Sequence, residues 1–167
     1  MMKKNILCLL LLIAGVVLLS GCSGGNQVPS SPAASTLDVN TVFSKLSDLN
    51  KVENPRVVDE FSLTNDFNLK ADQIAEYKGE LGNTMSVGGV NLVVKAKDGS
   101  ASEVKSTLEA YLAAQVEFYG KYAEFGDVQA LLKKGVVQTS GNVVVLAAAG
   151  TNMSSLDIAG TIKDVLK

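Results

Sequence analysis

Apolar side chains form one unbroken run near the start of the chain, at residues 6–19, where no polar side chain occurs. A helix needs roughly 20 apolar residues to span a bilayer, so this run is short for a permanent anchor. Its length is typical of the apolar region of a cleaved secretory signal, and Lys3 and Lys4 supply the basic segment before it. The pattern predicts an exported protein.

Small and turn-forming residues without charge occupy residues 23–36. Such a stretch has too little apolar content to build a core, and it indicates a flexible tether that extends on the order of 20 Å. The expected organisation is therefore a signal peptide at residues 1–21, a tether at 22–36 and a single domain at 37–167.

Helical spacing of apolar residues begins after Asp38, a candidate cap, and ends at Asn54-Pro55. A second, shorter helix is predicted to start at Ser62. The first helix presents apolar residues at intervals of three and four: Val39, Val42, Phe43, Leu46 and Leu49.

Two hairpins are predicted from strand-like runs joined by turn residues. The first joins residues 74–81 to 90–96 through a glycine-rich loop, and the second joins 136–139 to 143–149 through Ser140-Gly141-Asn142. Each is expected to be an antiparallel pair.

Three more helices are predicted in the second half of the chain. The longest follows Ser100 and runs to about Tyr122, a short one ends at Lys133-Lys134-Gly135, and a terminal one is capped by Ser154 or Ser155. The element order indicates a single α+β domain, with an antiparallel sheet of about four strands from the two hairpins and with helices packed on it.

Leu19-Ser20-Gly21-Cys22 resembles the lipobox of bacterial lipoproteins at all four positions. The resemblance implies a diacylglyceryl group on the Cys22 thiol, cleavage before Cys22 and acylation, for example by palmitate, of the new amino terminus. Two or more acyl chains give stable anchoring. The expected location is the extracytoplasmic face of the cell membrane, and the alternative is an ordinary secretory signal that ends near a cysteine.

Cysteine and histidine usage excludes several kinds of chemistry. Cys8 lies in the signal, Cys22 is expected to carry lipid, and the chain has no histidine. A disulfide, a thiolate or histidine metal site and a cysteine or histidine catalyst are therefore not expected, nor is a cofactor. The whole chain has a formal net charge of −2, which becomes −4 once Lys3 and Lys4 are removed, so nucleic acid is not an expected partner.

Three stretches between about Asn68 and Gly150 carry a resemblance to a known family: residues 75–78, residues 90–98, and residues 118–122 together with 141–145. They resemble the family of uncharacterised clostridial lipoproteins described as a domain of unknown function, DUF4358. Asn91 stands where an acidic residue is common in that family, and Ala123 follows Tyr122 where a proline is common. The resemblance implies an α+β fold, export and lipidation in a Gram-positive anaerobe, and it assigns no activity and no binding residues.

Five of the nine aromatic residues fall within the longest predicted helix and its end: Tyr111, Phe118, Tyr119, Tyr122 and Phe125. Four of them share one helical face, and such a stripe usually packs on a sheet. The interpretation is a core stripe that leaves Tyr119 and Tyr122 as the candidate surface contacts.

Two charged pairs are candidate sites. Asp72 and Glu76 would share a face if their segment were helical, yet no calcium loop surrounds them, and a solvated acidic face is favoured. Lys133 and Lys134 could meet anionic lipid headgroups, although a position at a helix end already explains them.

Three hypotheses of function follow. The first is a non-enzymatic binding or accessory module, held in the envelope by lipid, that engages an envelope protein or a small ligand. The second is a hydrolase that uses a carboxylate pair facing across a cleft. The third is a structural component in which an edge strand pairs with a partner.

Overall fold

The computed structural model describes residues 37–167. Its strands form one antiparallel sheet in the order β1-β2-β3-β5-β4. Both expected hairpins are confirmed. The strands are β1 (Pro55–Val57), β2 (Ile74–Gly82), β3 (Gly88–Ala96), β4 (Val136–Ser140) and β5 (Val143–Gly150). The signal segment, Cys22 and the tether lie outside the described residues.

The sheet has five strands, one more than expected, because β1 follows the Asn54-Pro55 break in a stretch for which the sequence predicts no element. β1 is three residues long and pairs with the end of β2, with Pro55 opposite Gly82. A proline is accommodated here because β1 is an edge strand and Pro55 is its first residue.

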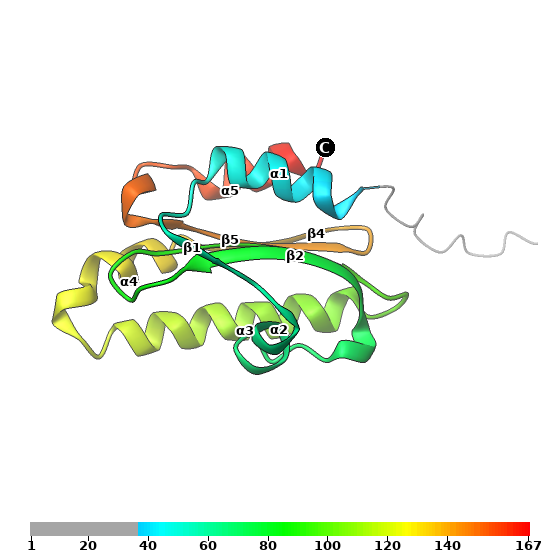
Figure 1. Cartoon of the computed structure of the whole chain (residues 1–167), viewed down its shortest axis with the longest axis horizontal. Helices are drawn as coiled ribbons and strands as arrows, with labels where there is room; N and C mark the ends of the chain where they lie inside the picture. Colours follow the sequence, from blue (N-terminus) through cyan, green and yellow to red (C-terminus); the bar gives the residue numbers. More distant parts are fainter. Residues whose placement is uncertain (1–36) are drawn as a thin grey trace, which may run out of the picture. The chain divides into compact units, whose positions relative to one another are not determined.

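Helices cover both faces of the sheet (Figure 1). α1 and α5 lie on one face, α2 and α3 lie on the other, and α4 packs against α3 and the strands at one end. The helices are α1 (Val39–Leu49), α2 (Glu60–Asn65), α3 (Ala101–Tyr119), α4 (Gly126–Leu132) and α5 (Ile158–Val165), with short 3₁₀ turns η1 (Ala71–Gln73), η2 (Ala123–Phe125) and η3 (Thr151–Met153).

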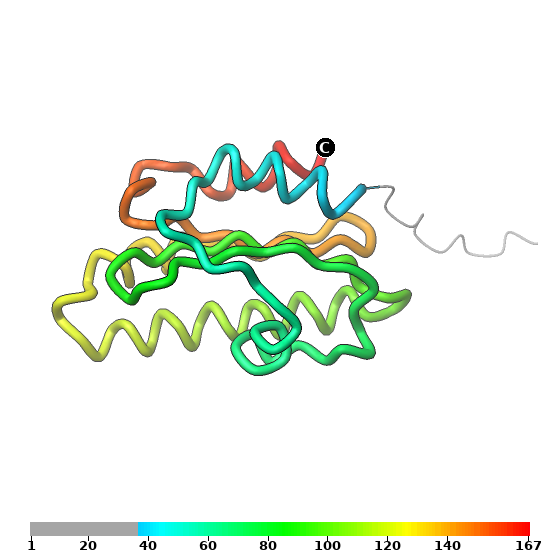
Figure 2. Tube along the Cα trace, in the orientation of Figure 1, coloured from blue at the N-terminus to red at the C-terminus, as the bar shows by residue number. Residues whose placement is uncertain are grey.

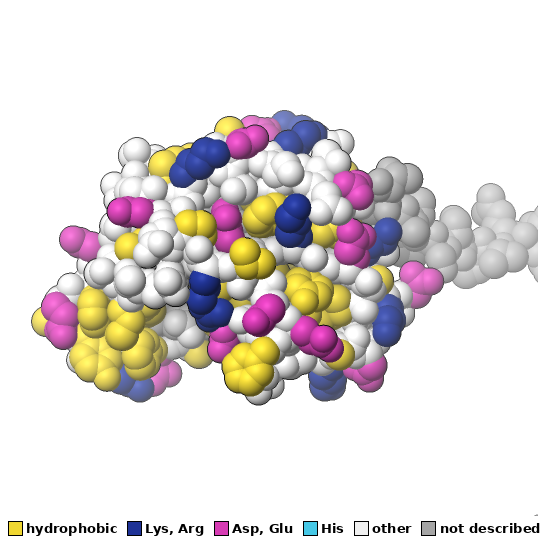
Figure 3. Space-filling view, viewed as in Figure 1, with side chains coloured by type: hydrophobic (Ala, Val, Ile, Leu, Met, Phe, Trp, Pro, Cys, Tyr) yellow, Lys and Arg dark blue, Asp and Glu magenta, His cyan; other side chains and the backbone are white. Residues whose placement is uncertain are grey.

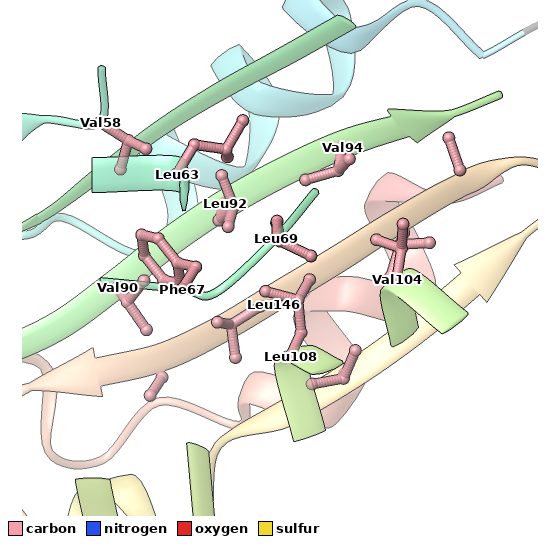
Figure 4. Close-up of a cluster of buried hydrophobic side chains, with 14 of the residues drawn as sticks. Val58, Leu63, Phe67, Leu69, Val90, Leu92, Val94, Val104, Leu108 and Leu146 are labelled. Carbon is pink, nitrogen blue, oxygen red and sulfur yellow. The ribbon is translucent and has the colours of Figure 1, made fainter. Parts of the chain in front are cut away.

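Strand alternation divides the interior into two cores, because successive side chains of a strand point to opposite faces. In β3, Leu92 and Val94 face α3, whereas Val93 faces α1. Figure 4 shows the core on the α3 side, where Phe67 and Leu69 from the segment after α2 meet side chains of the sheet and α3. The central strands are thus buried on both faces, which explains their nearly continuous apolar sequence.

Helix caps confirm one expected start and correct two. The Asp38 carboxylate accepts from the Thr41 backbone N–H at 2.8 Å, which caps α1 and lowers the pKa of Asp38. α2 is capped by Asp59 rather than begun at Ser62, and α5 is capped by Asp157 rather than by Ser154 or Ser155. In each corrected case the helix is capped by an aspartate adjacent to it and not by a serine.

Both ends of the described chain lie at the α1 and α5 layer, as the tube in Figure 2 shows. The start of α1 and the corner where α3 meets α4 are at opposite ends of the domain. None of the helices within residues 37–167 has the length and apolar content needed to cross a membrane.

Candidate binding surface

The end of α3 forms an aromatic corner, defined by Phe118, Tyr119, Tyr122 and Phe125. α3 ends at Tyr119, three residues earlier than expected, and the chain turns back on itself. Backbone hydrogen bonds hold that turn, from Tyr122 N–H to Tyr119 C=O at 3.2 Å and from Phe125 N–H to Tyr122 C=O at 3.1 Å. The turn brings rings from both sides of the helix end together.

Gly120 allows α4 to pack on this turn. The Gln129 side chain of α4 crosses over Gly120 to donate to the Val116 carbonyl at 3.0 Å. A Cβ at Gly120 would overlap that amide, so a larger residue there would displace the Gln129 side chain. The contact links α4 to the end of α3.

The four rings pack edge to face or tilted against one another. Phe118 lies 5.5 Å from Tyr119 and 5.6 Å from Tyr122 between ring centroids, and Phe125 lies 5.8 Å from Tyr119 and 6.1 Å from Tyr122. These separations are typical of stabilising aromatic pairs. The rings therefore support each other as a preformed surface.

Phe118 is 41% exposed and Tyr122 is 42% exposed, whereas Tyr119 and Phe125 are half-buried. The expectation that Phe118 belongs to the core is therefore wrong. The fully buried residues of α3 are Val104 and Leu108 in its first half, and Phe118 packs on its aromatic neighbours. Figure 3 shows the resulting cluster of hydrophobic side chains where α3 meets α4.

A groove leads along α3 to the aromatic corner. This α3 groove is a hollow of about 460 Å³ between α3 and the Asp66–Asn68 segment. Ala114 lines it, and Phe118 is one turn further on the same helical face. The groove therefore leads toward the corner along one face of α3.

Tyr111 lies in the wall of the α3 groove and packs on Phe67, with 4.5 Å between ring centroids. Burial raises the pKa of Tyr111 to about 12. The phenol is therefore protonated throughout the physiological range and is able to donate a hydrogen bond.

The two charged pairs that the sequence offers as candidate sites lie in different parts of the fold. Asp72 lies in η1 and Glu76 lies in β2, so they do not share a helical face. Glu76 accepts from the Asn40 amide at 3.3 Å. Lys133 and Lys134 follow α4 and are both exposed. Within residues 37–167, no three Asp, Glu, His or Cys side chains gather in a way that would hold a metal ion.

A buried polar network on the α1 side was not anticipated. Asn50 and Asn91 are fully buried, and the Asn50 amide donates to the Asn91 side-chain oxygen at 2.7 Å. The Asn91 amide donates in turn to the Asn50 carbonyl at 2.8 Å and to Glu80 at 2.9 Å. The feature of the sequence that indicates this network is Asn91, a polar residue inside an apolar strand. The network joins the end of α1 to the sheet.

The fold and this surface define a class, a small α+β domain with helices on both faces of an antiparallel sheet and an exposed aromatic corner. Within that class the chain belongs to the family described as Domain of unknown function (DUF4358), whose model matches residues 48–149. The match confirms the resemblance to DUF4358 itself, and the matched residues include the aromatic corner. No curated protein and no solved structure gives a significant match to the chain.

Proposed function

We propose that this protein is a lipid-anchored binding module of the cell envelope that acts on no substrate itself and engages an envelope protein or small ligand through the aromatic corner. The exposed rings carry the proposal. Large exposed aromatic side chains gathered in one patch are typical of interaction sites. Phe118 and Tyr122 are exposed and touch each other, unlike Phe61, which is 70% exposed with no aromatic neighbour among the described ring contacts.

The lipobox and the placement of the corner support the anchored form of this proposal. Lipid on Cys22 would attach the domain to the membrane through the tether that leads into α1. The aromatic corner lies at the far end of the domain from the start of α1. A partner in the envelope would therefore meet the corner on the side away from the attachment point.

The carboxylates beside the α3 groove favour binding over hydrolysis. Asp66 and Glu103 both line the groove, and each is ion-paired, with Arg56 and Lys70 respectively. The hydrogen bond from Lys70 lowers the pKa of Glu103. A general acid needs a raised pKa, which is the opposite shift.

The test is affinity capture from envelope extracts with the lipidated full-length protein, comparing wild type with the double variant Phe118→Ala/Tyr122→Ala. Phe61→Ala is the control, because it removes an even more exposed ring outside the corner. We expect a partner that is lost with the double variant and retained with the control. Equal capture by all three proteins would refute a role for the corner, and turnover of glycan, peptide or ester substrates would refute a purely binding role.

A further inference from the structure

The two edges of the sheet differ in how well they are protected. β1 is three residues long and begins with a proline, which is a usual way to blunt an edge. β4 is five residues long and contains neither proline nor a charged side chain. Among the described strands, only β5 pairs with β4. β4 is therefore the edge on which a further strand has room to add.

The register of the second hairpin shows which backbone groups are available. Ser140 lies opposite Val143 across the two-residue turn, and backbone groups of alternate residues in an antiparallel strand point to opposite sides. The N–H and C=O groups of Val137 and Thr139 consequently face away from β5. They offer donors and acceptors to an added strand.

A second hollow, the β4 groove, lies beside this edge and measures about 520 Å³. Its walls are mainly apolar, and its two charged side chains are Glu109 and Lys133. It is lined by Glu109, Leu112, Ala113 and Val116 of α3, by Leu132 and Lys133 at the end of α4, and by Gly135, Val136 and Val137.

The groove sets which side chains of an added strand would be buried. Val137 belongs to the core on the α3 side, so a residue paired with it would also point toward α3. The residue two positions further along would do the same, opposite Gly135, where Leu112 is the nearest α3 side chain. Two alternate apolar side chains of the added strand would therefore enter the groove.

The charge of Lys133 indicates the direction in which an added strand would run. An antiparallel strand, the arrangement of every pair in this sheet, would run toward the start of β4 and end beside Lys133. Lys133 is exposed, and within residues 37–167 its ammonium group donates only to the Gln129 side chain, at 3.2 Å. A terminal carboxylate would find a cationic partner at that place.

We propose that β4 and the β4 groove bind the carboxyl-terminal residues of a partner protein. The partner's extended end adds to β4 as an antiparallel strand, its last and third-last side chains are apolar and enter the groove, and its terminal carboxylate pairs with Lys133. This site is separate from the aromatic corner and does not depend on it.

The experiment uses the full-length protein in detergent and immobilised libraries of short peptides. One library has free carboxyl termini with Val, Leu, Ile or Phe at the last and third-last positions, and a second library is identical but amidated. We expect the free acids to bind and the amides to bind about tenfold more weakly, since a charge-assisted hydrogen bond is lost. Equal binding of acids and amides, or no binding of either library, would overturn the proposal.

Variants separate the two contacts. Lys133→Ala should remove the preference for the free acid, and Lys163→Ala, an exposed lysine on α5, should leave it unchanged. Thr139→Pro should weaken binding of both libraries because it removes an outward N–H. Thermal melts show whether Thr139→Pro folds, and if it does not, the Lys133→Ala result decides alone. A dimer in light scattering that Thr139→Pro dissociates would mean that a second copy occupies the edge, against the proposal.

Discussion

Asn91 shows how one buried polar residue couples two elements. Its side chain contacts the end of α1 through Asn50 and contacts β2 through Glu80, which also accepts from Ser47 at 2.8 Å. Groups that are buried this deeply are costly when their hydrogen-bond partners are removed. The network therefore fixes where α1 ends on the sheet.

Asn91→Leu should lower the free energy of unfolding by about 1–3 kcal/mol, because the Asn50 amide and carbonyl lose partners. Asn40→Ala, an exposed asparagine of α1, should change it by less than about 0.5 kcal/mol. Urea denaturation of both variants gives the comparison. A stable Asn91→Leu protein would show that the network has no energetic role.

Phe67 and Phe118 make a second matched pair, one ring fully buried and the other exposed. Phe67→Ala should cost about 3–5 kcal/mol because it leaves a cavity in the core. Phe118→Ala should cost clearly less than Phe67→Ala, because a ring that is 41% exposed leaves no enclosed cavity when it is removed. Denaturant midpoints of the two variants test this, and equal losses would mean that the corner is part of the core.

Tyr111 makes the free energy of unfolding fall as the pH rises through the alkaline range. Its pKa is about 12 in the fold against 10.0 ordinarily, so the unfolded chain loses this proton first as pH rises. The raised pKa contributes roughly 2–3 kcal/mol to the free energy of unfolding. This contribution is complete below pH 10 and is lost between about pH 10 and 12. Tyr111→Phe should flatten this part of the stability curve relative to wild type. Parallel curves for the two proteins from thermal melts would contradict the assignment.

At the scale of the elements, local periodicity predicted the presence of the helices and hairpins. The wrong predictions concern where elements begin or end, and one short strand. The start expected at Ser62 and the cap expected at Ser154 or Ser155 are replaced by caps at Asp59 and Asp157, whose carboxylates accept the hydrogen bonds. β1 was missed because three residues are too few to show alternation. Its pairing depends on β2, which is distant in the chain, so no local pattern could have revealed it.

The first hairpin should be sensitive to Gly82, since a Cβ there would overlap the Gly88 carbonyl oxygen across the strand ends. Gly82→Ala should therefore shift backbone atoms of β2 or β3 and lower the melting temperature by several degrees. Gly126→Ala is the control, because a Cβ at that position meets nothing within 4 Å. Similar melting temperatures for the two variants would argue against this close approach.

For the whole molecule, the domain boundary remains a prediction from composition. A protein comprising residues 36–167 should be soluble and unfold in one cooperative transition, because the tether is expected to contribute nothing to either core. Circular dichroism through a thermal melt measures this. Loss of the fold without residues 22–35 would move the boundary.

The anchor is tested at the same scale. Cys22→Ala should block lipidation and leave an uncleaved precursor, whereas wild type should carry lipid on Cys22. Mass spectrometry of the two membrane-extracted proteins distinguishes them. A wild-type mature protein that begins elsewhere and carries no lipid would exclude the lipobox reading.

The sequence by itself determined the fold class, both hairpins, the presence of all five helices and the family, because these depend on periodicity and motifs within short stretches. It could not determine that Phe118 is exposed, since helical spacing identifies a shared face but not what lies beneath it. The turn after Tyr119 and the approach of Gln129 to Gly120 place those rings at the surface. Likewise, the open edge of β4 and its groove arise only when α3 packs beside a strand more than 15 residues away in sequence. Contacts between distant segments decide which side chains remain available to a partner.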